Sequence, residues 1–160
     1  MTTTSPFGPV DESLAVPPAV CPQMACTTAA GPSSVQRMRR FVLNCVRRLG
    51  LSESTGDTAC LIVSELVTNA VLHSGSCSVA VLVGLAPEHL LISVRDGGSW
   101  LERPEPRRSI ADDDVPCGRG LDLVRAIADR CTIVSGASGT AVEARVRLDS
   151  TSSVPTETLR

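Results

Sequence analysis

Apolar residues along the middle of the chain follow two different periods, and each period predicts its own kind of element. Helical spacing predicts helices over residues 33–49, 53–74 and 120–130. Alternation and β-branched content predict strands over residues 77–85, 89–96, 131–135 and 140–148, with a weaker candidate at 23–30. The turn Ala-Pro-Glu joins two of these strands, which favours an antiparallel hairpin.

The last predicted strand separates its side chains cleanly between two faces. Val142, Ala144, Val146 and Leu148 fall on one side, and Glu143, Arg145 and Arg147 fall on the other. One face of the sheet is therefore expected to meet water. The pattern predicts an α+β fold, a two-layer α/β sandwich whose mixed, mostly antiparallel sheet carries its helices on one face.

Capping residues and a change in composition predict where the first helix and the domain begin and end. Ser33 or Ser34 can cap the first helix, which Gly50 ends. Residues 1–22 and 149–160 are rich in Ser, Thr and Pro and are predicted to be flexible tails around one domain, 23–148.

An irregular segment interrupts the pattern between residues 97 and 117. It contains three prolines and the acidic run 112–114, which is most simply solvated. A loop of this length inside a domain is usually functional or mobile.

Composition narrows the classes of protein that remain. Hydrophobic residues make up 42% of the 160-residue chain but aromatic residues only 2%, so the core must be aliphatic. No apolar run is long enough to cross a membrane and the N-terminus is unlike a secretory signal, so a cytoplasmic protein without membrane contact is expected. The net charge of −2 argues against direct nucleic-acid binding.

Lysine and cysteine usage excludes further chemistry. All fifteen basic residues are Arg, which rules out a Walker-type P-loop and a lysine Schiff base. The seven cysteines are odd in number and include no Cys-x-x-Cys, so neither a zinc site nor a disulfide framework is predicted. We interpret them as reduced and mostly buried thiols.

The second predicted helix carries three polar groups at intervals of four residues, Glu65, Asn69 and His73. Each step of four advances ~6 Å along the axis and turns by only ~40°, so the three form a row. The neighbours Ile62, Val63, Leu66, Val67 and Ala70 are apolar and are expected to face the sheet. The row is either the solvent side of an amphipathic helix or a set of oxygen ligands for a hydrated cation such as Mg²⁺.

Three glycine motifs follow, each weak alone. Asp96 ends a strand before Gly97 and Gly98, where a carboxylate could accept a hydrogen bond from a ligand amine; an ordinary Asp-Gly turn is the alternative. Gly118-Arg119-Gly120 precedes the third helix, whose first N–H groups would suit a phosphate. Gly139-Thr140 opens the last strand and by itself indicates only a hairpin.

The order of these motifs resembles the ATP-binding domain shared by gyrase, histidine kinases and related ATPases, the GHKL or Bergerat fold. "SELVTNAVLH" is similar to the family's N box and "DGG" to its first glycine box. "GRGL" is similar to the second glycine box and "GT" to the last conserved turn. The resemblance covers about residues 24–148.

The resemblance implies a role for each matching residue. Asn69 would bind the Mg²⁺ that bridges the ATP phosphates, Glu65 would be the catalytic base or orient the attacking group, and Asp96 would accept a hydrogen bond from the adenine amine. The remaining nucleotide-binding residues would be His73, Gly98, Gly118, Arg119, Gly120, Leu121 and Thr140. Residues 100–117 would form the ATP lid. Trp100 stands where the family often has a second Gly, and its ring could pack on adenine or narrow the pocket.

A stand-alone domain of this size resembles the anti-sigma-factor serine kinases of bacteria, especially small actinomycete regulators. The resemblance implies a Mg-ATP-dependent protein serine/threonine kinase that phosphorylates an anti-sigma antagonist, binds a sigma factor, controls transcription by partner switching and can form a homodimer. A nucleotide-responsive adaptor without turnover is the alternative, and a fold that binds no nucleotide is a third hypothesis. Five arginines between residues 37 and 48 could meet an acidic partner, although a solvated helix face is the simpler interpretation.

Overall fold

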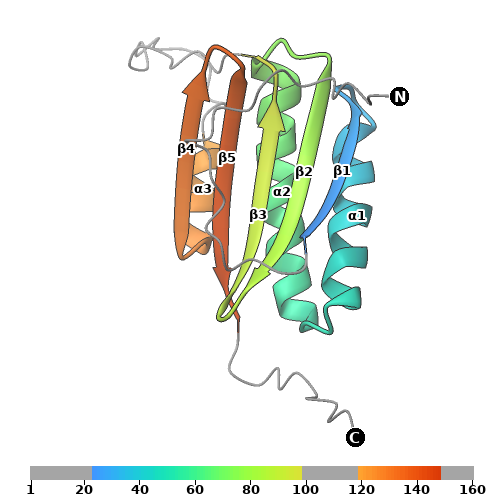
Figure 1. Cartoon of the computed structure of the whole chain (residues 1–160), viewed down its shortest axis with the longest axis vertical. Coiled ribbons are helices and arrows are strands. Elements are labelled where there is room, and N and C mark those ends of the chain that lie inside the picture. The colour runs from blue at the N-terminus through green and yellow to red at the C-terminus, as the bar shows by residue number, and fades with distance from the viewer. Residues whose placement is uncertain (1–22, 99–118, 149–160) are drawn as a thin grey trace, which may run out of the picture.

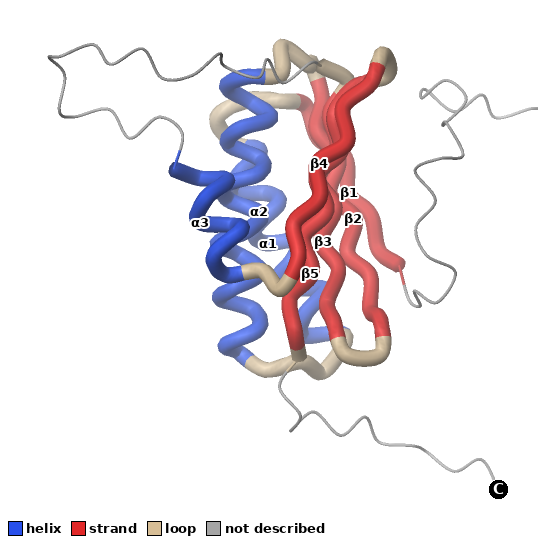
Figure 2. The backbone as a smooth tube through the Cα atoms, turned by 90° about the vertical axis from the view of Figure 1, so that its left-hand side faces the viewer, coloured by secondary structure: helices blue, strands red, loops and turns tan. Residues whose placement is uncertain are grey.

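The computed structural model describes residues 23–98 and 119–148, and the two predicted tails and the predicted lid lie outside these ranges. The described chain forms a five-stranded sheet with helices packed on one face, which confirms the predicted α+β sandwich (Figures 1 and 2). The strands are β1 (Gln23–Ala29), β2 (Ser78–Ala86), β3 (His89–Asp96), β4 (Arg130–Gly136) and β5 (Gly139–Arg147). The helices are α1 (Ser34–Arg48), α2 (Glu53–His73) and α3 (Arg119–Ile127).

The sheet has the strand order β1-β2-β3-β5-β4, and all four described pairs are antiparallel rather than mixed as expected. One helix between two strands carries the chain back to the end of the sheet where the first strand began, so the second strand runs parallel to the first. Between β1 and β2 there are two helices, α1 and α2, and the chain is therefore again at the end where β1 finished. For this reason β2 runs antiparallel to β1. A short turn joins β4 to β5 and requires the same antiparallel arrangement.

The core is aliphatic, as the composition predicts. The five apolar neighbours of the polar row are at most 1% exposed, and they face the sheet as predicted. They pack on the inward side chains of β2, β3 and β5, which include Val81, Ile92 and Val142. No helix in the described ranges is long and apolar enough to span a membrane.

Two local predictions are wrong for identifiable reasons. Ser33 occupies the N-cap of α1 without a side-chain cap, and the Ser34 hydroxyl donates to the carbonyl of Gly31 instead. The third helix was expected to reach residue 130 but ends at Ile127. The N–H of Asp129 donates to the carbonyl of Arg145 at 2.8 Å. Because this N–H is bonded to β5, it does not bond within the helix, and the helix ends.

Candidate functional site

The polar row of α2 lies at the edge of the buried stripe. Glu65 and Asn69 are half-buried, whereas His73 in the last turn is exposed. None of the three forms a hydrogen bond or ion pair with another described residue. Glu65 and Asn69 therefore combine partial burial with side-chain oxygen atoms that no described residue uses.

The beginning of α3 meets this row directly at Gly120. A Cβ on Gly120 would lie 2.5 Å from Oε2 of Glu65 and 3.6 Å from Nδ2 of Asn69. A side chain here would therefore displace the carboxylate of Glu65. The second glycine motif thus keeps a helix N-terminus, where N–H groups have no partner within the helix, against the polar row.

Asp96, Gly98 and Thr140 form a second polar group at the end of β3. The Asp96 carboxylate is 7% exposed, and its Oδ1 accepts the N–H of Gly98 at 2.9 Å. Thr140 is opposite Asp96 in the β3–β5 register, is 2% exposed, and donates from Oγ1 to the carbonyl of Gly98 at 3.2 Å. A hydrogen bond therefore joins Thr140 to Gly98, although the two residues are more than forty positions apart in the sequence.

Two serines that sequence reasoning missed connect this group to α2. The Ser74 hydroxyl donates to the carbonyl of Ala70 at 2.6 Å and accepts the N–H of Ser76 at 3.0 Å. The Ser76 hydroxyl accepts the N–H of Gly97 at 3.1 Å. Ser-Gly-Ser directly after a helix is a signal for such turns, since serine hydroxyls bond to nearby backbone groups.

Two glycines permit the close backbone contacts at this end. A Cβ on Gly98 would lie 1.7 Å from the carbonyl oxygen of Ser74, so this glycine has a structural role at the end of α2. Gly139 has φ of +127°, and a Cβ there would lie 1.9 Å from the carbonyl oxygen of Asp96. Contact of Gly98 with a purine stays a prediction.

The other predicted site residues are less informative. Leu121 is half-buried and packs against the core. Arg119 begins α3, but Gly118, the side chain of Arg119 and Trp100 lie outside the described part of the site.

A magnesium site made of protein ligands alone is not found in the described ranges, where no cluster of three or more His, Cys, Asp or Glu could hold a metal ion. Asn69 supplies one unused carboxamide oxygen beside the carboxylate of Glu65. Mg²⁺ commonly binds through one or two protein oxygens together with water and substrate phosphates. The donor set therefore fits a metal ion that arrives with a nucleotide.

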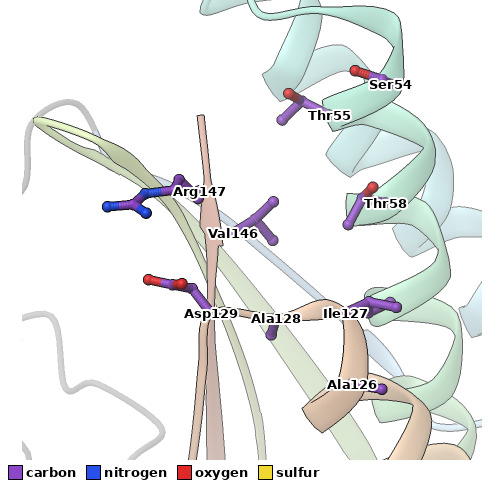
Figure 3. Close-up of a pocket in the computed structure, with 9 residues that line it drawn as sticks. All are labelled: Ser54, Thr55, Thr58, Ala126, Ile127, Ala128, Asp129, Val146 and Arg147. Carbon is purple, nitrogen blue, oxygen red and sulfur yellow. The ribbon is translucent and has the colours of Figure 1, made fainter. Parts of the chain in front are cut away.

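The larger cavity lies at the opposite end of α2 (Figure 3). Its volume is ≈ 400 Å³, and its walls include Thr55 and Thr58 from the start of α2, Ile127 from α3 and Val146 from β5. Thr58 precedes Asn69 by eleven residues, which is about 16 Å along the helix axis. The cavity is therefore separate from the glycine-rich site, and its size alone does not make it the nucleotide site.

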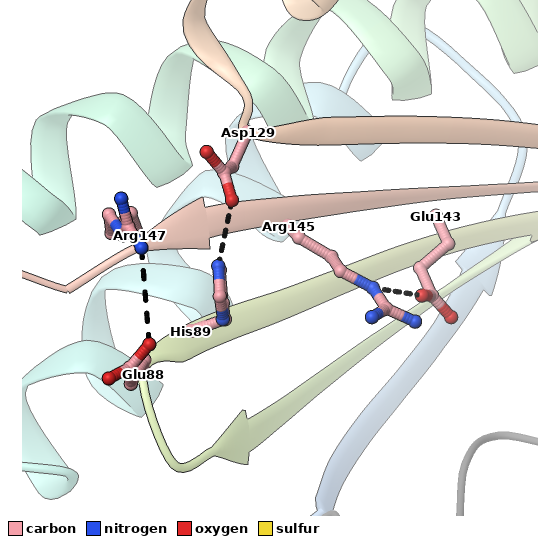
Figure 4. A network of polar contacts seen from close by, with 6 residues as sticks. All are labelled: Glu88, His89, Asp129, Glu143, Arg145 and Arg147. Carbon is pink, nitrogen blue, oxygen red and sulfur yellow. Dashed lines mark hydrogen bonds and ion pairs between the residues drawn. The ribbon is translucent and has the colours of Figure 1, made fainter.

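Exposed ion pairs lie near that cavity (Figure 4). His89 Nε2 is 2.9 Å from Asp129 Oδ2, and Arg147 is 4.0 Å from Glu88. The hydrogen bond from His89 is the main reason why the pKa of Asp129 lies below its ordinary value.

Five cysteines lie in the described ranges, and all are free thiols. Burial raises the pKa of Cys45 to about 11 and also raises the pKa of Cys60 and Cys131. Cys45 and Cys60 are buried, Cys26 and Cys131 are half-buried and Cys77 is exposed, so the predicted burial holds for two of the five described thiols.

Comparison with known families identifies the domain. The model of the histidine kinase-like ATPase domain matches residues 28–146, so the chain belongs to this family. Among solved structures, the chain is similar to the crystal structure of the RsbU and RsbW domains of Rv1364c from Mycobacterium tuberculosis, with a TM-score of 0.63 and 24% identity. The match covers 79% of this chain but only 32% of the other, and it supports the fold alone. No curated protein matches the chain.

Proposed function

We propose that the glycine-rich end of the sandwich binds Mg-ATP and that the chain is a protein-serine kinase of the anti-sigma type. The observation that carries the proposal is the contact of Gly120 with Glu65 and Asn69, since it brings the start of α3 to the two polar side chains. Three observations together favour a triphosphate at this point. The chain belongs to a family of ATPase domains, a helix begins here, and Glu65 and Asn69 have no partner among the described residues.

Each part of the proposed site has a distinct task. Asp96, held by the N–H of Gly98, accepts a hydrogen bond from the adenine amine. Asn69 would hold Mg²⁺ through its carboxamide oxygen, and the ion would supply positive charge against the phosphates. Because the chain has no Lys, Arg119 and backbone N–H groups supply the remaining positive charge.

Glu65 performs the proton transfer in this proposal. Its carboxylate takes the proton from the serine hydroxyl of a partner protein while that oxygen attacks the γ-phosphorus and ADP leaves. Its half-buried position and its lack of a partner among the described residues support this role. The partner that receives the phosphate is proposed to be an anti-sigma antagonist, and a sigma factor is the second partner.

The basic face of α1 is a candidate surface for such partners. Its five arginines are exposed, and none takes part in an ion pair within the described ranges. An acidic protein surface would complement this charge, although solvation alone also explains it.

Transfer of labelled phosphate tests the proposal. The chain is incubated with γ-labelled ATP and a candidate antagonist protein, and the Glu65→Gln variant is compared with Glu53→Gln, which changes an exposed glutamate of the same helix. We expect Glu65→Gln to lower transfer by about 100-fold, as for loss of a general base, and Glu53→Gln to have no effect. Equal transfer by both variants would remove Glu65 from the mechanism.

Calorimetric titration with Mg-ADP tests the binding site separately. Asn69→Ala and Asp96→Asn are both expected to weaken binding by about tenfold or more, since each removes a charge-assisted or metal contact. Unchanged affinity in both variants would reject the nucleotide site itself.

The alternative function is a nucleotide-responsive adaptor that binds its partner without phosphorylating it. Trp100 at the position of the second glycine favours this alternative, because its ring could narrow the pocket. Nucleotide binding with no transfer to any tested partner would select it. If Mg-ATP at about 100 times a plausible dissociation constant gives none of the expected ~2.7 kcal/mol of stabilisation, the fold binds no nucleotide.

A further inference from the structure

The face of the sheet that carries no helix has an apolar half next to the edge strand β1 (Figure 2). This uncovered patch consists of outward positions on β1, β2 and β3, namely Ala25, Ala80, Leu82, Gly84 and Leu91. Leu91 is only 6% exposed although no helix covers it. A shallow depression of ≈ 20 Å³ lies in the patch, and its walls include Leu82, Leu91, Ser93 and Arg95.

Arg95 stands at the border of this patch with an unsatisfied buried donor. Its Nε is buried and has no hydrogen-bond partner within the described ranges. The cross-strand neighbours of Arg95 are Ala80 and Ala141, which offer no side-chain acceptor. Buried donors of charged groups nearly always have a partner in native proteins, because leaving one unsatisfied is costly.

The acceptor does not come from the nearest carboxylate on the same face. Glu143 accepts a hydrogen bond from Nε of Arg145 at 3.1 Å, and Figure 4 shows this pair on the open side of the sheet. The Nε–H of Arg95 therefore finds no acceptor within the described ranges, and a carboxylate from elsewhere in the chain would satisfy it. A carboxylate can accept two parallel N–H bonds from one guanidinium.

Residues 1–22, which lead directly into β1, contain suitable groups. The segment has two carboxylates, Asp11 and Glu12, and no Arg or Lys. Apolar residues lie on both sides of this acidic pair, including Val10 and Leu14. Its charge and its apolar residues therefore complement Arg95 and the uncovered patch.

The length of the segment is sufficient to reach Arg95. Glu12 lies eleven residues before Gln23, a span of up to roughly 36 Å when extended. Gln23 on β1 is opposite Gly84 on β2, and Gly84 is opposite Leu91 on β3. Arg95 is four residues beyond Leu91 along β3. Crossing two strand spacings and four residues requires only about 17 Å.

We propose that residues 1–22 cross the open face of the sheet, with Asp11 or Glu12 on the guanidinium of Arg95 and apolar side chains on the uncovered patch. Rotation of the last side-chain bonds of Arg95 turns its Nε–H toward the carboxylate. The segment then excludes a second protein chain from this half of the sheet and leaves the helical layer with the nucleotide site untouched. The proposal does not depend on kinase activity.

Photo-crosslinking in the full chain tests this placement. Leu82 is replaced by p-benzoylphenylalanine, and ¹⁵N-labelled and unlabelled chains are mixed in equal amounts before irradiation. Mass spectrometry of crosslinked peptides is expected to find bonds between position 82 and residues 1–22 of the same isotopic form. Crosslinks of mixed isotopic form would show that a second copy covers the face, and their predominance would overturn the proposal. Absence of any crosslink to residues 1–22 would overturn it as well.

Charge variants test the contact with Arg95. In the crosslinking chain, Asp11→Asn combined with Glu12→Gln should lower the intrachain yield by about two- to fivefold, the range expected for loss of one partly exposed ion pair. Arg95→Gln should lower the yield equally, and combining all three changes should lower it no further. Glu157→Gln is the matched control, since it removes a carboxylate from the other end of the chain.

An unchanged yield in the acidic double variant would reject the ion pair. The same charge variants are also compared with p-benzoylphenylalanine at position 80. The result then does not depend on one substitution that could disturb the fold. Circular dichroism of every variant verifies that the sheet is intact.

Discussion

Polar side chains near the two ends of α2 differ in their burial and in their hydrogen-bond partners. At the end that carries His73, polar side chains are buried and bonded to backbone: Asp96 accepts the N–H of Gly98, and the Ser74 hydroxyl donates to the carbonyl of Ala70. At the end that carries Thr55, charged groups lie in the open, where Asp129 meets His89 with 48% of its side chain exposed. The first end has tight glycine contacts, and the second has the larger cavity.

The two ends differ in how well their geometry is fixed. Exposed ion pairs contribute little, because water and salt screen them. Buried polar groups that are fixed by backbone bonds keep a defined geometry, which a ligand can use. The predicted nucleotide residues therefore gather where the backbone contacts are tight, and not at the cavity beside Thr55 and Thr58.

The largest expected effect comes from filling a tight backbone contact. Gly139→Ala should destabilise the protein by about 3 kcal/mol or more, since the Cβ would strike the carbonyl of Asp96 and φ is +127°. Urea unfolding measures the change. Gly136→Ala, at the other side of the same hairpin, meets nothing within 4 Å and should change stability by less than about 1 kcal/mol. Equal stability of the two variants would contradict the tight backbone contact between Gly139 and Asp96.

Ionisation of a buried thiol provides the next effect in size. The pKa of Cys45 in the folded chain is about 11, above its ordinary value of 9.0. Its contribution to stability is therefore complete below pH 9 and is lost as the pH rises toward 11. The loss should reach roughly 2–3 kcal/mol near pH 11, since each pKa unit corresponds to about 1.4 kcal/mol.

Urea unfolding between pH 8 and 11 measures this loss. Cys45→Ala lowers stability at neutral pH but should flatten the alkaline decline. Cys77→Ala removes an exposed thiol and should leave the decline as in the parent chain. If stability falls equally steeply between pH 8 and 11 in the parent chain, Cys45→Ala and Cys77→Ala, the burial of Cys45 is not the cause of the fall.

Gly120→Ala is expected to have a smaller effect on stability but a specific effect on phosphate transfer. The new Cβ meets the flexible end of Glu65, so the cost in unfolding free energy should be below about 1 kcal/mol. Displacing that carboxylate should still lower phosphate transfer about tenfold, because small misplacements of catalytic groups slow reactions strongly. Labelled-ATP assays and urea unfolding measure the two effects. Gly97→Ala, whose Cβ would lie 3.5 Å from the Ser76 hydroxyl, should leave transfer unaltered.

The smallest effect is expected at the exposed end. The hydrogen bond from His89 lowers the pKa of Asp129, so this group stabilises the fold above its ordinary value of 3.8, and the contribution is lost as the pH falls through the lower folded pKa. Asp129→Asn should slightly flatten the acid branch of stability and leave Mg-ADP binding unchanged. Acid titration followed by circular dichroism tests the first expectation, and calorimetry tests the second. A strong loss of nucleotide affinity would show that the two ends are coupled.

Sequence alone predicted the elements of the fold and named the residues of the candidate site. The helical period places Glu65 and Asn69 in one row, because spacing along a helix is a local property. Alternation along β5 assigns one wet and one buried face in the same way. The N box and the glycine motifs also indicated the family, because their order along the chain is visible without coordinates.

Only the tertiary structure decided how these motifs meet. Contact of Gly120 with Glu65 and alignment of Asp96 with Thr140 depend on strand order and helix packing, which a local pattern does not encode. The early end of α3 has the same origin, since pairing with Arg145 on a neighbouring strand overrides helical propensity. That Nε of Arg95 has no acceptor within residues 23–98 and 119–148 likewise emerges only when the sheet is assembled, because burial is set by neighbours that are distant in the sequence.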